Sequence, residues 1–183
     1  ITNGSFEGTD VANNSSADVV QAGWRTVLGT NGNRVDTLDY NGAPDGEQYA
    51  ELDQAGGYRQ VVNTDAGRVY TLDFDFKNNA NGSVADNEFE VWWNGQKVGD
   101  YAPGSGQGWT NSQLSLVGTG GAVALEFRTK TNTQGRSNFN GAHIDGIELR
   151  AGASPSSGNW GANMLVNGSF ENYGGAGGWA GNS

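Results

Sequence analysis

The 183-residue chain contains no cysteine, only three prolines and a single histidine. The lack of cysteine excludes a disulfide framework, a thiolate metal site and a cysteine nucleophile. A histidine-based catalytic triad would have to use His143, and no Gly-x-Ser-x-Gly motif accompanies that residue. The chain also has no signal peptide and no apolar run of about 18 residues, so we expect a soluble piece of a longer protein, without membrane insertion.

Positive charge is scarce as well. Ten Lys and Arg stand against twenty Asp and Glu, for a formal net charge of −10. Because such a chain repels phosphate backbones, and its basic residues are scattered, nucleic acid is not an expected partner. The acidic surplus suits solubility or the binding of hard cations such as Ca²⁺. The lack of cysteine is compatible with the cytosol, but a lysine-poor chain rich in Gly, Asn and Asp also suits large exported bacterial surface proteins, so we predict an extracellular or cell-surface location.

Glycine is abundant, with 31 residues, and valine, threonine and aromatic residues are gathered in short runs. No helical period is sustained, so the sequence predicts an all-β, antiparallel fold. The clearest strand is predicted at 69–76, where an apolar set alternates with a polar set that includes Asp73 and Asp75. Further strands are predicted at 19–28, 48–53, 58–62, 88–93, 97–101, 109–117, 122–129 and 142–150.

The alternation within these strands predicts which side chains face the core. In 88–93, Phe89, Val91 and Trp93 point inward, so Glu90 and Trp92 point outward. By the same rule Tyr49 and Arg128 point outward from their strands. An Asn94-Gly95 hairpin turn and a bulge at Asp145-Gly146 are also predicted.

A short repeat indicates how the chain is organised. The sequence Asn-Gly-Ser-Phe-Glu at 3–7 returns at 167–171, and a Gly-Trp pair follows each copy. We therefore predict a binding module at 1–152, a Gly/Ser/Pro linker at 153–162, and the first strand and start of a truncated second copy at 163–183. Residues 3–7 are expected to form a short strand with Phe6 inward. Neighbouring repeat modules of the same chain are expected partners.

The order of motifs along residues 1–150 resembles a known fold family. NGSFE is followed by GW, DGEQYAELD, RQVV, AGRVYTLDFDF, FEVWWNG and GAHIDGIEL. This set resembles galactose-binding-domain-like jelly rolls, in particular the carbohydrate-binding modules of families four and twenty-two and the NGSFE-type repeats of large calcium-dependent bacterial adhesins. The resemblance implies an antiparallel β-sandwich with a binding function.

The resemblance also implies a structural calcium ion that ties the first strand to the last. The matching carboxylates are Glu7 and Asp145, with main-chain carbonyl groups near Asn3 and, as a weaker candidate, Asp45 completing the ligands. In the alternative reading, Glu7 and Asp145 are solvated or accept hydrogen bonds from neighbouring amides.

A sugar site needs an aromatic face for the pyranose ring and polar groups for its hydroxyls. Trp92 is the principal candidate, because its strand leaves it outside the core; the alternative is that it packs under a loop or a neighbouring domain. The polar and aromatic neighbours predicted to assist it are Glu90, Asp73, Asp75, Arg128 and Tyr49.

Three functions follow from these observations. The favoured one is a non-catalytic carbohydrate-binding module that binds a glycan or polysaccharide. The alternative is an adhesin module that recognises a peptide or protein, or acts as a spacer. A hydrolase is least favoured, because Asp73 and Asp75 are predicted to lie on a continuous sheet face rather than in a cleft. We therefore expect no enzymatic activity.

Overall fold

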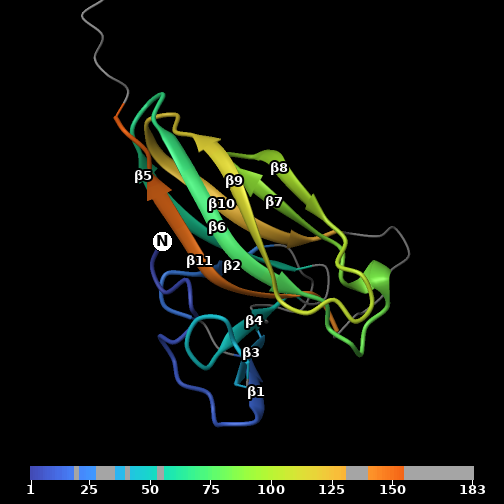
Figure 1. Ribbon diagram of the computed structural model, residues 1–183. Coiled ribbons are helices and arrows are strands. Elements are labelled where there is room, and N and C mark those ends of the chain that lie inside the picture. The colour runs from blue at the N-terminus through green and yellow to red at the C-terminus, as the bar shows by residue number, and fades with distance from the viewer. Residues whose placement is uncertain (19–20, 28–35, 40–41, 53–55, 131–139, 155–183) are drawn as a thin grey trace, which may run out of the picture.

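The computed structural model describes residues 1–18, 21–27, 36–39, 42–52, 56–130 and 140–154. Two antiparallel sheets pack face to face into a β-sandwich (Figure 1). Sheet A has the strand order β1-β3-β4-β11-β6-β9, and sheet B has the order β2-β5-β10-β7-β8. The strands are β1 (Ser15–Asp18), β2 (Arg25–Thr26), β3 (Asp36–Asp39), β4 (Tyr49–Glu51), β5 (Gly57–Thr64), β6 (Val69–Lys77), β7 (Phe89–Trp93), β8 (Gln96–Tyr101), β9 (Thr110–Val117), β10 (Gly121–Thr129) and β11 (His143–Ala151).

Helix contributes almost nothing to the described part of the chain. A single 3-10 turn, η1 (Val84–Asp86), lies between β6 and β7. Within the described residues no helix is long and apolar enough to cross a membrane. The all-β fold class is therefore confirmed. The predicted second copy at 163–183 lies outside the described residues, as does most of the predicted linker.

The core lies between the two sheets and is rich in aromatic side chains. On β6 every second residue is buried, as its alternation predicts. Phe74 from sheet A packs edge-on against Phe127 from sheet B, with ring centroids 5.0 Å apart. Phe89 stacks on Tyr101 at 4.8 Å. Because burial of such apolar surface is the main favourable term in folding, this cluster holds the sheets together.

Two local predictions are confirmed by the backbone. Asn94 and Gly95 both have positive φ (50° and 77°) and connect β7 to β8, as an Asn-Gly hairpin turn requires. The pairing of β11 with β6 shifts register between Asp145 and Glu148, where Gly146 has a φ of 57°. This bulge lets Ile144 and Ile147 both face the core.

The predicted strand at 3–7 is wrong: these residues form turns, with positive φ at Asn3 (52°) and Phe6 (58°). The buried Phe6 side chain stacks on Trp24, with ring centroids 5.5 Å apart. The turn meets the sandwich at the β11 bulge, where the Ile147 N–H donates to the Gly4 carbonyl oxygen (3.1 Å). Since β11 already pairs with β4 and β6, it offers no free edge for a strand.

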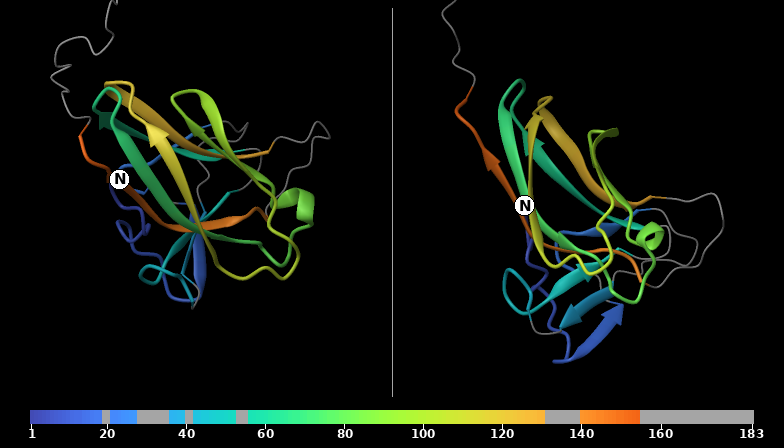
Figure 2. Two further views of the ribbon diagram at one scale, coloured as in Figure 1. Left: turned by 45° about the horizontal axis from the view of Figure 1, so that its top comes forward. Right: turned by 45° about the vertical axis from the view of Figure 1, so that its right-hand side comes forward.

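The region around Trp24 also differs from the prediction. The expected strand at 19–28 is represented in the described residues by the two-residue β2, and β1 begins at Ser15, before the start of that expected strand. Trp24 is buried in the core. Figure 2 shows β1, β3 and β4 extending from one end of sheet A, beyond the edge of sheet B.

Candidate functional site

The structure divides the predicted sugar-binding residues between the two outer faces of the sandwich. Trp92 and Glu90 on β7 and Arg128 on β10 lie together on the outer face of sheet B. Asp73 and Asp75 on β6 and Tyr49 on β4 belong to sheet A. The predicted set is therefore two separate groups, because β6 and β7, although consecutive, lie in different sheets.

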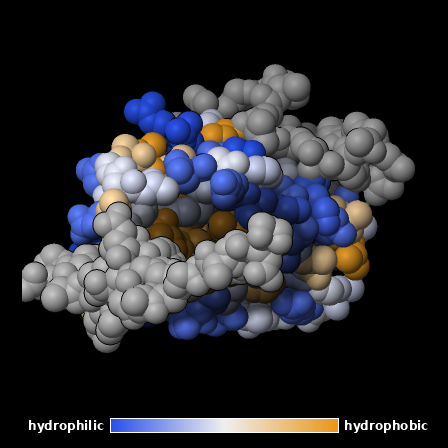
Figure 3. Space-filling model, turned by 90° about the horizontal axis from the view of Figure 1, so that it is seen from above, coloured by the Kyte–Doolittle hydropathy of each residue, from blue (hydrophilic) through white to orange (hydrophobic). Residues whose placement is uncertain are grey.

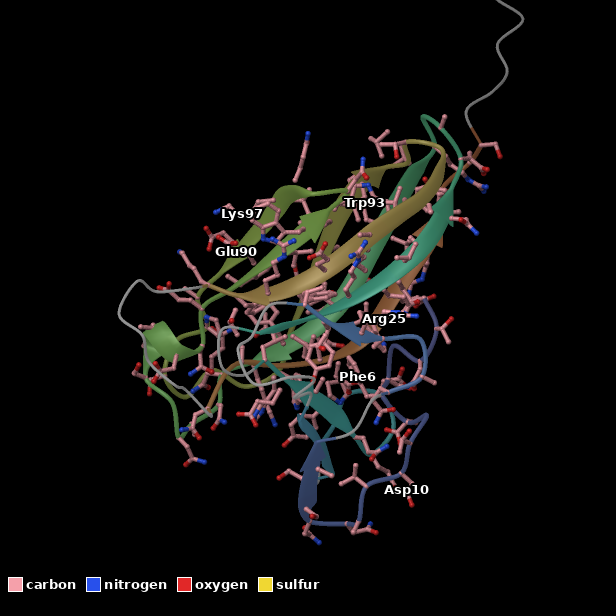
Figure 4. All side chains as sticks on the ribbon, turned by 180° about the vertical axis from the view of Figure 1, so that it is seen from behind. Phe6, Asp10, Arg25, Glu90, Trp93 and Lys97 are labelled. Atoms are coloured by element: carbon pink, nitrogen blue, oxygen red, sulfur yellow. The ribbon has the colours of Figure 1, made fainter. Side chains whose placement is uncertain are left out.

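The group on sheet B forms a network around Trp92. The indole Nε1 donates to Glu90 Oε2 at 2.9 Å, and the Arg128 guanidinium carbon lies 4.4 Å from the indole centroid. Arg128 Nε in turn donates to Glu126 Oε2 at 2.6 Å. Lys97 Nζ bonds Glu90 Oε1 at 3.0 Å, and Glu90 and Lys97 lie together on the β7–β8 hairpin (Figure 4). We call these five residues the Trp92 cluster.

Sequence reasoning missed Lys97 as a member of this cluster. In the sheet, Trp92 pairs with Lys97 on β8 and with Glu126 on β10. The Asn94-Gly95 turn could have predicted that Lys97 lies beside Trp92, because a tight hairpin turn fixes which residues of the two strands lie opposite each other. No sequence signal placed β10 beside β7.

Asp73 on sheet A is engaged by amide side chains of β9. Asn111 Nδ2 donates to Asp73 Oδ1 at 2.7 Å, and Gln113 Nε2 donates to Asp73 Oδ2 at 2.6 Å. The hydrogen bond from Asn111 is the main cause of a lowered pKa of Asp73. A general acid in a glycosidase needs a raised pKa, so this arrangement gives Asp73 no such role. Asp75 also accepts from Asn111, at 3.3 Å.

Tyr49 points to the outer face of sheet A, but it is not exposed: only 3% of its surface is accessible, and this part of the prediction is wrong. Trp109, which precedes β9, lies edge-on to Tyr49 at 5.4 Å and donates from Nε1 to the Gly42 carbonyl oxygen at 2.6 Å. Lys77 Nζ lies 4.3 Å from the Tyr49 centroid and 4.5 Å from the Trp109 centroid. Burial lowers the pKa of Lys77. Residues distant in sequence thus cover this end of the sheet.

The only histidine lies at the same covered end. His143 is buried, and burial lowers the pKa of its imidazole. Its Nε2 lies 3.6 Å from Glu51 Oε1, and neither ring nitrogen makes a hydrogen bond with the described residues. Asn79 donates to the same Glu51 oxygen. With no serine or cysteine nucleophile bonded to His143 in the described residues, the geometry does not form a catalytic triad.

Three of the predicted calcium ligands converge around the 45–48 turn. The Asp45 N–H donates to Asp145 Oδ2 at 3.0 Å. Glu7 Oε1 accepts from the N–H groups of Glu47 (2.7 Å) and Gln48 (2.6 Å). Asn3 is turned away: its Oδ1 accepts from the Gly8 N–H, and its carbonyl oxygen accepts from Trp24 Nε1. The turn therefore brings Glu7, Asp45 and Asp145 to one place and leaves Asn3 beside it.

Asp145 lies in an unusually buried environment for a carboxyl group. Its residue surface is fully buried, and Oδ1 has no hydrogen-bond partner among the described residues. Burial raises the pKa of Asp145 to about 7, and the charges of Asp45 and Glu7 act in the same direction. No three His, Cys, Asp or Glu side chains in the described ranges are arranged to hold a metal ion by themselves. A cation here would need carbonyl oxygens as further ligands.

Comparisons with known proteins add information on the fold. No protein-family model matches the sequence, and no curated protein shows a significant sequence match. Solved structures do match. The K2 cleaved adhesin domain of Lys-gingipain aligns with a TM-score of 0.55 and 13% identity, over 81% of this chain and 96% of that chain. The enzymatically active domain of bacteriophage CBA120 tailspike protein 4 aligns with a TM-score of 0.50 and 14% identity, over 71% of this chain and 19% of that chain.

A family 35 carbohydrate-binding module from Clostridium thermocellum aligns with a TM-score of 0.48 and 16% identity, over 69% of this chain and 90% of that chain. The matches with a TM-score of 0.50 or above support the β-sandwich fold of this chain. At these identities the likeness establishes the fold alone, because one fold hosts many functions. The resemblance to families four and twenty-two and to NGSFE-type adhesin repeats stays a prediction.

Proposed function

We propose that this chain is a non-catalytic carbohydrate-binding module of an extracellular, multi-modular protein, and that it binds glycans through the Trp92 cluster. The observation that carries the proposal is the fixed indole of Trp92 on the outer face of sheet B. Its N–H is bonded to Glu90, and the Arg128 guanidinium lies over its ring. An aromatic side chain held in this way loses little conformational entropy when a ligand binds.

The cluster combines the two kinds of contact that a sugar needs. The half-buried indole, covered by Arg128 on one face, would offer its remaining exposed apolar surface to a pyranose ring. Around it, carboxylate oxygens of Glu90 and the cationic groups of Lys97 and Arg128 can accept from and donate to hydroxyl groups. The face is a continuous strand surface, which suits an extended polysaccharide better than a small enclosed molecule.

The test compares Trp92→Ala with Trp109→Ala, the half-buried tryptophan on the opposite sheet. Both variants and the unsubstituted chain are applied to a glycan array, and the affinity for the best-retained glycan is then measured. Loss of an indole stacked on sugar should cost on the order of 1 kcal/mol or more, so Trp92→Ala should bind at least about tenfold more weakly. Trp109→Ala should bind as before, and Trp92→Ala should melt close to the original temperature.

Three results would contradict this assignment. Selective loss of binding in Trp109→Ala would move the site to sheet A. Unfolding of Trp92→Ala would show that the indole stabilises the fold. Retention of no glycan by the original chain, with binding on a peptide array, would favour the adhesin alternative, which the likeness to the Lys-gingipain adhesin domain makes worth testing. Binding on neither array would favour a spacer.

We also propose a structural calcium ion at Asp145, with Glu7 and Asp45 as neighbouring carboxylates. The buried Oδ1 of Asp145 lacks a partner in the described residues, and the charges of Asp45 and Glu7 add to the effect of burial in raising its pKa. A cation would satisfy that oxygen and relieve the repulsion, and carbonyl oxygens of the 45–48 turn would complete the ligands. Because Glu7 precedes β1 and Asp145 lies on β11, the ion would join the two ends of the module and stabilise the folded form by mass action.

The calcium proposal is tested with Asp145→Asn and, as the control, with Asp100→Asn, an exposed carboxylate on β8 in the other sheet. With calcium present, Asp145→Asn should lower the melting temperature and Asp100→Asn should not. In excess chelator the order of the melting temperatures should change: Asp145→Asn should melt at or above the original chain, because it removes a buried carboxyl group whose charged form is disfavoured by burial. If chelation leaves the melting curve of metal-loaded protein unchanged, the ion is not structural.

A further inference from the structure

A hollow opens at one end of the sandwich, between the edges of the two sheets. Its volume is about 310 Å³, and its apolar lining is Trp93, Val98, Leu116 and Val117, with Asn94, Gln96, Ser115 and Thr119 around them. Figure 3 looks onto this end and shows hydrophobic side chains at the bottom of a depression bordered by polar ones. We call it the end groove.

The end groove exists because the two edge strands diverge. β8 and β9 are the last strands of sheets B and A, so each has one unpaired edge in the described structure. Near Tyr101 the edges are joined, since the Tyr101 and Ser112 hydroxyls lie 2.8 Å apart. Towards the β7–β8 turn the Trp93 indole crosses between the sheets and donates to the Val117 carbonyl oxygen at 2.9 Å.

The exposed, uncharged lining of the end groove indicates what kind of segment would bind there. Val117 is 55% exposed and Val98 is 37% exposed, which are large fractions for valine. The lining contains no charged side chain. An uncharged apolar segment would bury this surface without desolvating a charge, and the free strand edges could pair with its backbone.

The chain itself leaves the module beside this groove. The Gly152 N–H donates to the Val69 carbonyl oxygen at 2.8 Å, and Val69 pairs with Val117 in the β6–β9 ladder. Since neighbouring strands lie about 4.8 Å apart, Gly152 lies about 10 Å from Val117. The exit of the module and its exposed apolar groove are therefore adjacent.

The sequence that follows contains a suitable segment. Residues 155–183, which lie outside the described residues, have one charged residue, Glu171, and one run of three large apolar residues, Met164-Leu165-Val166. The stretch between Ser154 and Met164 can span up to about 33 Å, several times the separation needed.

We propose that Met164-Leu165-Val166 docks into the end groove of the same chain. The apolar side chains fill the space above Trp93 and Leu116, and the backbone adds to a free edge of β8 or β9. Because the repeated NGSFE letters begin at Asn167, directly after this segment, the contact sets where the second copy starts relative to the first. The end groove is thus an inter-repeat interface, distinct from the proposed glycan face.

Engineered cysteine pairs test the proposal. Because the chain has no natural cysteine, the two introduced thiols are the only ones that can form a disulfide within it. Val117→Cys is combined with Leu165→Cys, and the control combines Val61→Cys with Leu165→Cys. Val61 is exposed to nearly the same extent as Val117, 53% against 55%, but lies on β5. Under mild oxidation the first pair should form an intramolecular disulfide at least about tenfold faster than the control. Equal rates in the two pairs would overturn the proposal.

A second measurement needs no cysteine. In the full chain, replacing Met164, Leu165 and Val166 with serine should increase amide hydrogen exchange in β9 at least about threefold and leave exchange in β5 unchanged. Unaltered exchange in β9 would count against docking. Cross-linked dimers whose yield rises with protein concentration would assign the groove to a second copy of the chain, and would equally overturn docking within one chain.

Discussion

Gly4 fixes where the N-terminal turn meets the sandwich. A Cβ at this position would lie 1.9 Å from the Ile147 carbonyl oxygen, which is backbone and cannot move aside alone. The close approach allows the hydrogen bond from the Ile147 N–H to the Gly4 oxygen and the entry of Phe6 into the core. A residue without a side chain is therefore required there.

Gly4→Ala should destabilise the module by about 1–3 kcal/mol, because the turn or β11 must shift to make room. Gly104→Ala is the matched control: no atom lies within 4 Å of its added Cβ. Urea unfolding of both variants gives the comparison, and the control should stay within about 0.5 kcal/mol of the original chain. Equal stability of the two variants would show that the N-terminal turn is not held against β11.

At the scale of an element, the β7–β8 hairpin depends on backbone conformation rather than on space. Gly95 has a φ of 77°, yet nothing lies within 4 Å of a Cβ built there. Gly95→Ala should therefore cost about 1 kcal/mol or more through the left-handed backbone alone. The loss should appear as a lower urea midpoint with an unchanged slope. Asn94→Gly, which removes a side chain from positive φ, should be neutral or stabilising.

The strands themselves were the most predictable part of the fold. On β6, β7 and β10 the inward side chains follow directly from alternation, because a strand half-buried in a sandwich imposes a period of two. Tight turns such as Asn94-Gly95 were equally predictable, since few residues tolerate positive φ. Residues 3–7 were not, because their turn conformation depends on a distant contact with Ile147.

The candidate site was predictable only in part, for a topological reason. Trp92 and Glu90 share one strand, so their common direction follows from the sequence. Whether Asp73 joins them depends on which sheet β6 enters, and that is set by long-range pairing with β9 and β11. The burial of Tyr49 likewise depends on Trp109, sixty residues later in the chain.

For the whole molecule, the core that the described residues form lies before residue 153. The buried apolar residues run from Phe6 to Ile147, and the Gly152–Val69 hydrogen bond comes at the end of β11. A chain ending at Ser154 should therefore keep the same β-type far-ultraviolet circular dichroism and unfold in one cooperative transition. Its melting temperature should fall by only a few degrees, the effect of losing a docked three-residue segment. Loss of cooperative unfolding would place part of the core in 155–183.

The contact between Gly4 and Ile147 also determines how the module responds to mechanical load. The N-terminal turn contacts β11 at Ile147, and the chain leaves β11 after Ala151. The two points through which tension would act on the module therefore lie on one strand, within about 20 Å of each other. The turn is held by the buried Phe6 and by separate hydrogen bonds of Thr2, Asn3, Gly4 and Glu7, without a ladder of strand pairs. Under tension we expect the N-terminal turn to detach first while the two sheets remain folded. The module should therefore lengthen before its sheets unfold.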